Sequence, residues 1–127
     1  MFVNIPNSDD LQTFVPAKDF EQSKQFYQDL GFNLNWEGSG VAQFAVGNYR
    51  FLLQDHYVKD FADNFMMFLN VEDVDAWWNY ILRTGVAEKY EIVLKPPQDY
   101  PWGLREIHML DPSGVFWHFA KDLEPSA

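Results

Sequence analysis

The stretch "YPWGLREIHMLDPSGVFWHFAK", residues 100–121, concentrates the side chains that could do chemistry. Within 22 residues it holds two Trp, two His, an Arg-Glu pair and an Asp-Pro-Ser-Gly turn. Imidazole and carboxylate groups are metal ligands, whereas indole rings offer flat faces on which an aromatic ligand can stack. The stretch therefore predicts either a catalytic metal site or a pocket that only binds.

Strand alternation sorts these side chains onto two faces. His118 shares a face with Phe116, while Trp117 lies on the opposite face. Arg105 and Glu106 are adjacent on a strand and point to opposite faces, so they cannot form a simple acid-base pair. Two interpretations of His118 stay open: a neutral histidine hydrogen-bonded within the fold, or a side chain that contacts ligand.

The remaining histidines carry less information. His108 alternates with Glu106 on the same expected strand and can be an ordinary strand residue. His56 lies in a polar connector, where we expect it to be solvated.

An internal repeat sets the elements that position these residues. The segments "AKDFEQSKQFYQDLGF" (17–32) and "VEDVDAWWNYILRTGV" (71–86) align without a gap at an offset of 54 residues. Asp19 is expected to cap the first helix, with Gln22 three residues on, and a glycine follows each helix. An apolar stripe at helical spacing places both Trp residues of the second copy in the core. It consists of Val74, Trp77, Trp78 and Ile81.

Each helix is preceded by one strand-like segment and followed by three, which gives a β-α-β-β-β unit twice. The expected strands are 11–17, 32–38, 41–48 and 49–55 in the first unit, and 65–71, 91–97, 104–110 and 115–121 in the second. We expect one domain over 1–127, with repeats at about 8–54 and 65–121 joined by 55–64. The fold class is α+β, with paired βαβββ units curling into a cupped mixed sheet that suits a small molecule.

Composition narrows the range of partners. The formal net charge of -10 repels phosphate backbones, which argues against nucleic acid and would attract a cationic ligand. No apolar run reaches the length of a membrane span. The absence of cysteine and of a signal-peptide pattern at the start favours a cytoplasmic location.

The paired units, with "FYQDLGF" ending the first helix and "DPSGVFWHFAK" near the end of the chain, resemble the vicinal oxygen chelate superfamily. That superfamily contains glyoxalases, extradiol dioxygenases, fosfomycin-resistance enzymes and bleomycin-resistance proteins. "PWGLREIHMLDPSGVFWHF" is most similar to the bleomycin-binding members, although Leu104 interrupts their pattern between Gly103 and Arg105. The resemblance runs from about Leu11 to Lys121.

The resemblance implies where catalytic members would hold a divalent metal. These positions fall near Gln12, at Met66, at Leu52 or Gln54, and at His118. Only His118 offers a convincing ligand, because Mg²⁺, Mn²⁺ and Zn²⁺ want several oxygen or imidazole donors. We therefore expect no metal and no cofactor.

The resemblance also implies ligand contacts. In the bleomycin-binding proteins the residue matching Trp102 stacks on the drug, and Trp36 falls where they carry an aromatic residue. The alternative for Trp102 is that it plugs the end of the sheet or a dimer contact. The expected ligand-binding residues are Trp36, Gln54, Met66, Trp102, Phe116 and His118.

The sequence thus predicts a homodimer that binds a small, cationic aromatic or glycopeptide ligand without catalysis, in clefts lined by both subunits. Protection against a bleomycin-like antibiotic would follow from sequestration. Two alternatives stay open: a metal-dependent glyoxalase or dioxygenase of the same superfamily, and a structural protein without a pocket.

Overall fold

A computed structural model describes residues 4–124 of the protein, which form two four-stranded mixed sheets. The first sheet has the order β1 (Phe14–Pro16), β4 (Tyr49–Gln54), β3 (Val41–Val46) and β2 (Asn33–Gly38). The second has the order β5 (Met66–Asn70), β8 (Phe116–Asp122), β7 (Leu104–Leu110) and β6 (Leu94–Asp99). In both sheets the first pair is parallel and the other pairs are antiparallel. The predicted α+β architecture of paired βαβββ units is confirmed.

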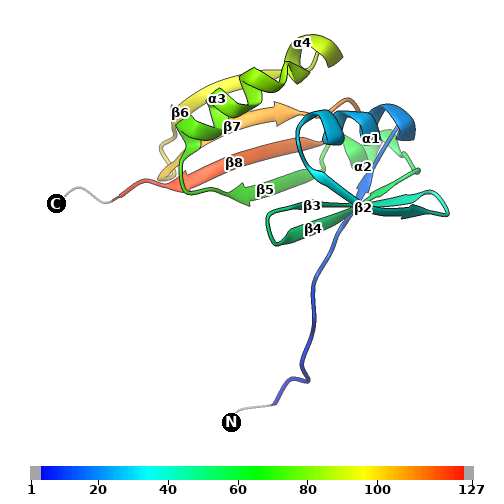
Figure 1. The fold of residues 1–127 in the computed structure, drawn as a ribbon. Helices are drawn as coiled ribbons and strands as arrows, with labels where there is room; N and C mark the ends of the chain where they lie inside the picture. Colours follow the sequence, from blue (N-terminus) through cyan, green and yellow to red (C-terminus); the bar gives the residue numbers. More distant parts are fainter. Residues whose placement is uncertain (1–3, 125–127) are drawn as a thin grey trace.

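The main helix of each unit begins where the sequence predicts. α1 (Phe20–Asp29) follows Asp19, whose carboxylate accepts a hydrogen bond from the Gln22 backbone N–H at 3.1 Å. α3 (Val74–Thr84) follows Asp73, which accepts from the Ala76 N–H at 3.0 Å. Each cap satisfies a backbone donor that has no partner within its helix. Figure 1 shows α3 lying across β6, β7 and β8.

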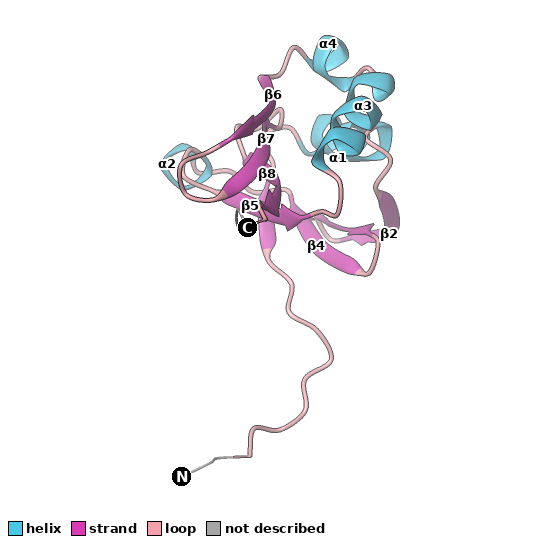
Figure 2. Cartoon of the chain, turned by 90° about the vertical axis from the view of Figure 1, so that its left-hand side faces the viewer, coloured by secondary structure: helices cyan, strands magenta, loops and turns pink. Residues whose placement is uncertain are grey.

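Three features differ from the sequence-based expectation. The connector holds a short helix, α2 (Lys59–Ala62), and α4 (Val86–Tyr90) follows α3 directly. The sequence predicts a strand over 91–97, whereas β6 begins at Leu94 and continues past the proline pair at 96 and 97 to Asp99. An edge strand tolerates proline because one side of it needs no hydrogen bonds, and a register shift between Lys95 and Gln98 accommodates the pair. Figure 2 shows α1, α3 and α4 gathered together, apart from α2.

The two units share one core. Trp117 on β8 donates its ring N–H to the hydroxyl of Tyr27 on α1 at 2.9 Å, and Tyr27 donates to Asp111 at 2.5 Å. Asp111 also accepts from the backbone N–H groups of Ser113 and Val115, which folds the Asp-Pro-Ser-Gly turn. Burial raises the pKa of Asp111 to about 6, against the opposing effect of the Tyr27 hydrogen bond. This turn therefore links the second unit to the first.

α1 packs on one face of the first sheet and α3 on one face of the second, and we call the opposite face of each sheet the outward face. It carries large exposed hydrophobic side chains, among them Phe14 on β1 and Met66 and Phe68 on β5. The segment before β1 runs away from the rest of the protein, as Figures 1 and 2 show, and it exposes Ile5 and Leu11. None of the helices formed by residues 4–124 is long and apolar enough to cross a membrane.

Candidate functional site

The candidate site lies on the outward face of the second sheet. Its central row runs across β5, β8 and β7, where Phe68 pairs with His118 and His118 pairs with His108. Because paired residues project to the same face, both imidazoles stand side by side, with ring centroids 5.0 Å apart. Their side chains are mostly covered but reach solvent.

Glu106 joins the row to the loop before β7. Its Oε1 lies 2.6 Å from His118 Nδ1 and 3.2 Å from His108 Nε2, and its Oε2 accepts the ring N–H of Trp102 at 2.6 Å. We call these four residues the Glu106 cluster. Glu106 is 1% exposed, so its charge is stabilised by these three partners and hardly by water.

Burial and hydrogen bonding shift the pKa of Glu106 in opposite directions. Burial favours the neutral acid and raises the pKa, while the hydrogen bonds from His118, Trp102 and His108 lower it. The combined effect of the hydrogen bonds is larger than that of burial, so the pKa lies below its ordinary value. The cluster therefore holds a carboxylate at neutral pH.

Aromatic rings extend the cluster along the outward face. The rings of Tyr100 and Trp102 stack with centroids 4.5 Å apart, and Tyr100 also stacks on His108 at 5.0 Å. Phe116 stacks on His118 at 4.3 Å. Trp102 nevertheless remains 61% exposed. Its indole is fixed by Glu106 and Tyr100 and leaves a broad ring surface for a ligand.

The structure brings together four of the six residues expected from the sequence to bind a ligand. Trp102 and His118 meet at Glu106, Phe116 stacks on His118, and Met66 is paired with Phe116 across β5 and β8. The other two, Trp36 and Gln54, belong to the first sheet. There the corresponding row pairs Phe14 with Leu52, Leu52 with Gln43 and Gln43 with Trp36, and Gln54 is paired with Val41 and Pro16.

Sequence reasoning gave too little weight to Tyr100, Glu106 and His108. The alternation of Glu106 and His108 on one strand was a usable signal, since it places both side chains on the face that His118 occupies. The position of Tyr100 depends on the turn that returns the chain into β7, where the Tyr100 N–H bonds the Leu104 carbonyl oxygen at 2.8 Å.

The metal positions of catalytic relatives do not form a ligand set here. Leu52 occupies the position in the first sheet that His118 occupies in the second. Leu52 is paired with Phe14 on the parallel strand β1, and His118 is paired with Phe68 on the parallel strand β5. Met66 offers a thioether, and the Gln12 amide oxygen already accepts a hydrogen bond from Gln43 at 2.9 Å. These residues do not fit a hard divalent ion.

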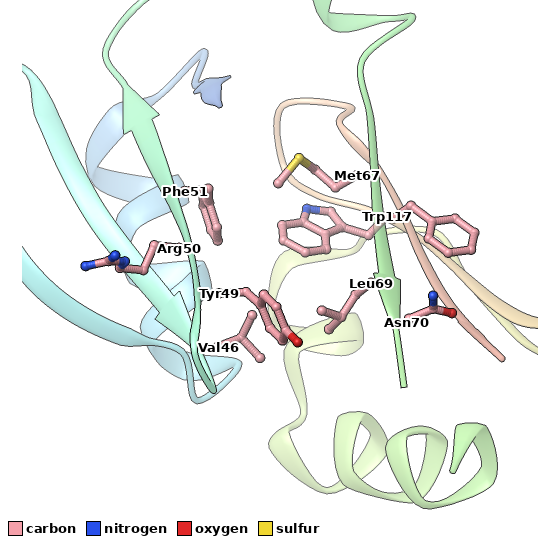
Figure 3. Close-up of a pocket in the computed structure, with 9 residues that line it drawn as sticks. Val46, Tyr49, Arg50, Phe51, Met67, Leu69, Asn70 and Trp117 are labelled. Atoms are coloured by element: carbon pink, nitrogen blue, oxygen red, sulfur yellow. The ribbon is translucent and has the colours of Figure 1, made fainter. Parts of the chain in front are cut away.

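A separate cleft of about 350 Å³ opens where the two sheets meet on their inner side. Figure 3 shows Val46, Tyr49 and Phe51 of the first sheet facing Met67, Leu69 and Trp117 of the second. Arg50 points away from the cleft and pairs with Asp10 at 2.7 Å. The lining is mainly apolar, with Arg50 and Asn70 as its polar members, and neither Trp102 nor His118 contributes to it.

Two mixed sheets built from successive βαβββ units, with an aromatic and imidazole surface on one outward face, define the class of protein. The family model described as Glyoxalase/Bleomycin resistance protein/Dioxygenase superfamily matches residues 11–119. The chain belongs to this superfamily. A search of curated protein sequences finds no significant match.

Solved structures with the same fold include binding proteins and an enzyme. The bleomycin-binding protein of Streptomyces verticillus, complexed with copper(II)-bleomycin, is 22% identical over 95% of this chain and 100% of its own, with a TM-score of 0.75. The antibiotic-binding protein TnmS3 of Streptomyces sp. CB03234 is 24% identical over 94% and 99%, with a TM-score of 0.73. Lactoylglutathione lyase of Agrobacterium tumefaciens is 20% identical over 91% and 95%, with a TM-score of 0.65. At these identities the likeness establishes the fold alone.

Proposed function

We propose that this protein binds and sequesters a small, flat, cationic aromatic compound, such as a bleomycin-like antibiotic, without chemical conversion. The observation that carries the proposal is the Trp102 ring: it is mostly exposed, yet held in place by Glu106 and stacked on Tyr100. A ring fixed before binding loses little entropy when a ligand stacks on it. Trp102 is thus suited to be the anchor of the site.

Charge supports a cationic ligand. The formal net charge of -10 draws cations toward the protein and speeds encounter. The carboxylate of Glu106 lies at the nitrogen edge of the indole, with its Oε2 2.6 Å from the ring nitrogen. A positively charged ring stacked on Trp102 would be attracted by both the indole face and this carboxylate.

A second copy of the chain is part of the proposal. The outward faces of both sheets expose large apolar side chains, including Phe14, Trp36, Phe68 and Trp102. If the first sheet of one copy faces the second sheet of the other, Trp36 and Gln54 come opposite the Glu106 cluster. Two equivalent clefts would then form, each lined by both subunits, as expected for a homodimer by its symmetry. The cytoplasmic location expected from the sequence also belongs to this proposal.

Titration of the intrinsic tryptophan fluorescence with bleomycin, and with a simpler bithiazole cation, tests the ligand class. We expect saturable quenching that weakens as salt is added. Trp102→Ala should weaken binding by about 1 to 3 kcal/mol, the range for losing an aromatic anchor. Phe61→Ala is the matched control, because Phe61 is exposed on α2 outside the site, and it should bind like wild type.

Two results would contradict this function. One is the absence of binding to wild-type protein by either compound, and the other is undiminished binding by the Trp102→Ala variant. The mass of the ligand recovered after incubation separates binding from catalysis, because sequestration returns the ligand unchanged. A converted product would instead favour the enzymatic alternative, for which the shared fold of a lactoylglutathione lyase is the supporting observation.

A further inference from the structure

We propose that Glu106, His108 and His118 form a binding site for a late first-row divalent cation, with Zn²⁺ as its representative. The site uses two residues of β7 and one of β8. It shares His118 with the positions implied for catalytic relatives, but Glu106 and His108 correspond to none of those positions. It also stands independently of the proposed aromatic ligand.

The three donor groups converge on one another. One ligand atom from each of the three residues lies within 4.8 Å of the other two. Glu106 Oε1 is the shared centre, since it faces both His118 Nδ1 and His108 Nε2. Two imidazoles and one carboxylate that meet at one point are the donor set of many three-ligand zinc sites.

The remaining polar atoms of two of these side chains, Glu106 and His108, already have partners. Trp102 occupies Glu106 Oε2, which leaves Oε1 as the ligand oxygen. The Tyr100 hydroxyl lies 3.3 Å from His108 Nδ1 and orients the ring so that Nε2 faces Glu106. With an ion on Nε2, the His108 proton would reside on Nδ1 and the Tyr100 hydroxyl would accept it. Metal-binding histidines and carboxylates commonly have such partners.

The spacing of the donors fits a tetrahedral ion after a small adjustment. Metal-ligand distances of about 2.0 to 2.1 Å place neighbouring ligand atoms about 3.3 Å apart. Glu106 Oε1 and His108 Nε2 are already 3.2 Å apart. The 2.6 Å contact between Oε1 and His118 Nδ1 must widen. Both nitrogens that donate to Oε1, His118 Nδ1 and His108 Nε2, must also give up their protons, to the other nitrogen of the same ring or to solvent, before an ion can bind them.

The donor chemistry selects the ion. Imidazole-rich sites suit Zn²⁺, Cu²⁺ and Ni²⁺, whereas Mg²⁺ prefers oxygen ligands and keeps several waters. Both histidines retain some exposure on the outward face, which provides a route for an ion. The proposal is therefore specific: Zn²⁺ should bind and Mg²⁺ should not.

Calorimetric titration of Zn²⁺ into full-length protein freed of metal by a chelator provides the test. We expect one ion per chain, and no binding of Mg²⁺ under the same conditions. His108→Gln and His118→Gln should each lower zinc affinity by at least about 100-fold, because loss of a ligand costs at least as much as loss of an outer partner. Trp102→Phe keeps a ring but removes the donor to Glu106, and should lower the affinity by about 10-fold.

His56→Gln is the matched control, because His56 is exposed outside the second sheet and should leave zinc affinity unchanged. Thermal melting checks that each variant is folded. If both histidine variants unfold, the zinc affinity of Trp102→Phe is the deciding measurement, and an unchanged affinity overturns the proposal. The proposal is overturned if wild-type protein binds no Zn²⁺, or if binding survives both histidine substitutions. It is also overturned if His56→Gln weakens binding as much as they do. Bleomycin titration in the presence of chelator tests the sequestration proposal separately.

Discussion

At the scale of single residues, Glu106 holds the side chains of the candidate site in place. A carboxylate that is almost fully buried must be compensated by hydrogen bonds, and here an indole and two imidazoles supply them. The same bonds fix the orientation of three rings on the outward face. Glu106 thus acts through its neighbours, and a ligand stacked on Trp102 need not touch it.

Replacing Glu106 by Gln should therefore loosen Trp102 as well as destabilise the fold. The glutamine amide has only one acceptor oxygen, so it cannot accept from all three partners, and its N–H₂ group meets another donor. We expect a loss of about 1 to 3 kcal/mol in the free energy of unfolding, the range for leaving a buried polar group unsatisfied. Urea titration measures this loss.

Glu21→Gln is the control, because its exposed carboxylate lies on α1, away from the second sheet. It should change stability by less than about 0.5 kcal/mol. If Glu106→Gln is equally mild, Glu106 does not organise the cluster.

Individual residues of the site could be predicted from the sequence more easily than the hydrogen bonds that join them. Trp102 and His118 were candidates because an indole in a loop and an imidazole on a strand have recognisable uses. Their link through Glu106 depends on the register that sets His108 opposite His118, and on the turn that carries Trp102 back over β7. Neither can be read from local spacing, since register is fixed by the packing of the whole sheet.

At the scale of elements, local signals were the reliable ones. The caps of α1 and α3 were predictable because donor and acceptor are three residues apart in the chain. The continuation of β6 beyond the proline pair to Asp99 was not predictable in this way, because it depends on β6 being the edge strand of its sheet.

The end of α1 packs closely against α3 of the second unit at Gly31, and a substitution there can test this packing. Its φ is +95°, and a Cβ added there would lie 1.8 Å from the Tyr80 hydroxyl oxygen. That hydroxyl donates to the Leu30 carbonyl oxygen at 2.8 Å, so Gly31→Ala must displace it and lose the bond. Gly85 also has a positive φ, but a Cβ there meets no atom within 4 Å.

Gly85→Ala should therefore cost about 1 to 2 kcal/mol of unfolding free energy for the left-handed backbone alone. Gly31→Ala should cost about 1 kcal/mol more, because the Tyr80 hydrogen bond is also lost. In a Tyr80→Phe background this excess should shrink, since no hydroxyl stands in the way. Equal costs for the two alanine variants in urea titrations would refute the close packing of Tyr80 on Gly31.

The Asp-Pro-Ser-Gly turn should make stability depend on pH. The pKa of Asp111 is about 6 in the folded protein, against an ordinary value of 3.8. Between these values the folded state binds more protons, so this group contributes stability below about pH 4 that is lost as the pH rises through about 6. The shift corresponds to a loss on the order of 2 to 3 kcal/mol.

Asp111→Asn cannot ionise, so its unfolding free energy should fall less than that of wild type between pH 4 and 7. Urea titrations at several pH values measure the difference. Asp60→Asn, at an exposed carboxylate on α2, should keep the wild-type pH dependence. Parallel curves for wild type and Asp111→Asn would show that Asp111 does not carry this effect.

The whole molecule shows how far the repeat alone could predict the fold. The offset of 54 residues relates Phe14 on β1 to Phe68 on β5. β1 pairs in parallel with β4, the last strand of the first unit, and β5 pairs in parallel with β8, the last strand of the second. That symmetry was enough to predict two similar βαβββ units, expected to form parts of one cupped sheet, whereas the structure has a separate four-stranded sheet for each unit. It could not show that Trp117 and Tyr27 would join the units into one core, because their hydrogen bond spans 90 residues and is specified by no local pattern.

The two outward faces lead to the last prediction, which concerns assembly. They expose Phe14, Trp36, Met66, Phe68 and Trp102, and exposed apolar patches commonly mark interaction surfaces. A second copy can cover both faces at once, so sedimentation at micromolar concentration should give about twice the chain mass of 14.9 kDa.

Phe68→Glu places a charge in the proposed contact and should shift the protein toward the monomer, because an unpaired charge is costly to bury. Phe61→Glu, at an exposed site on α2, should leave the dimer intact. A wild-type protein that sediments as a monomer would remove the shared cleft, and with it the contribution of Trp36 and Gln54 to ligand binding. The Glu106 cluster would remain as a site formed by one chain, since the three hydrogen bonds that hold it come from β7, β8 and the loop before β7 of that chain.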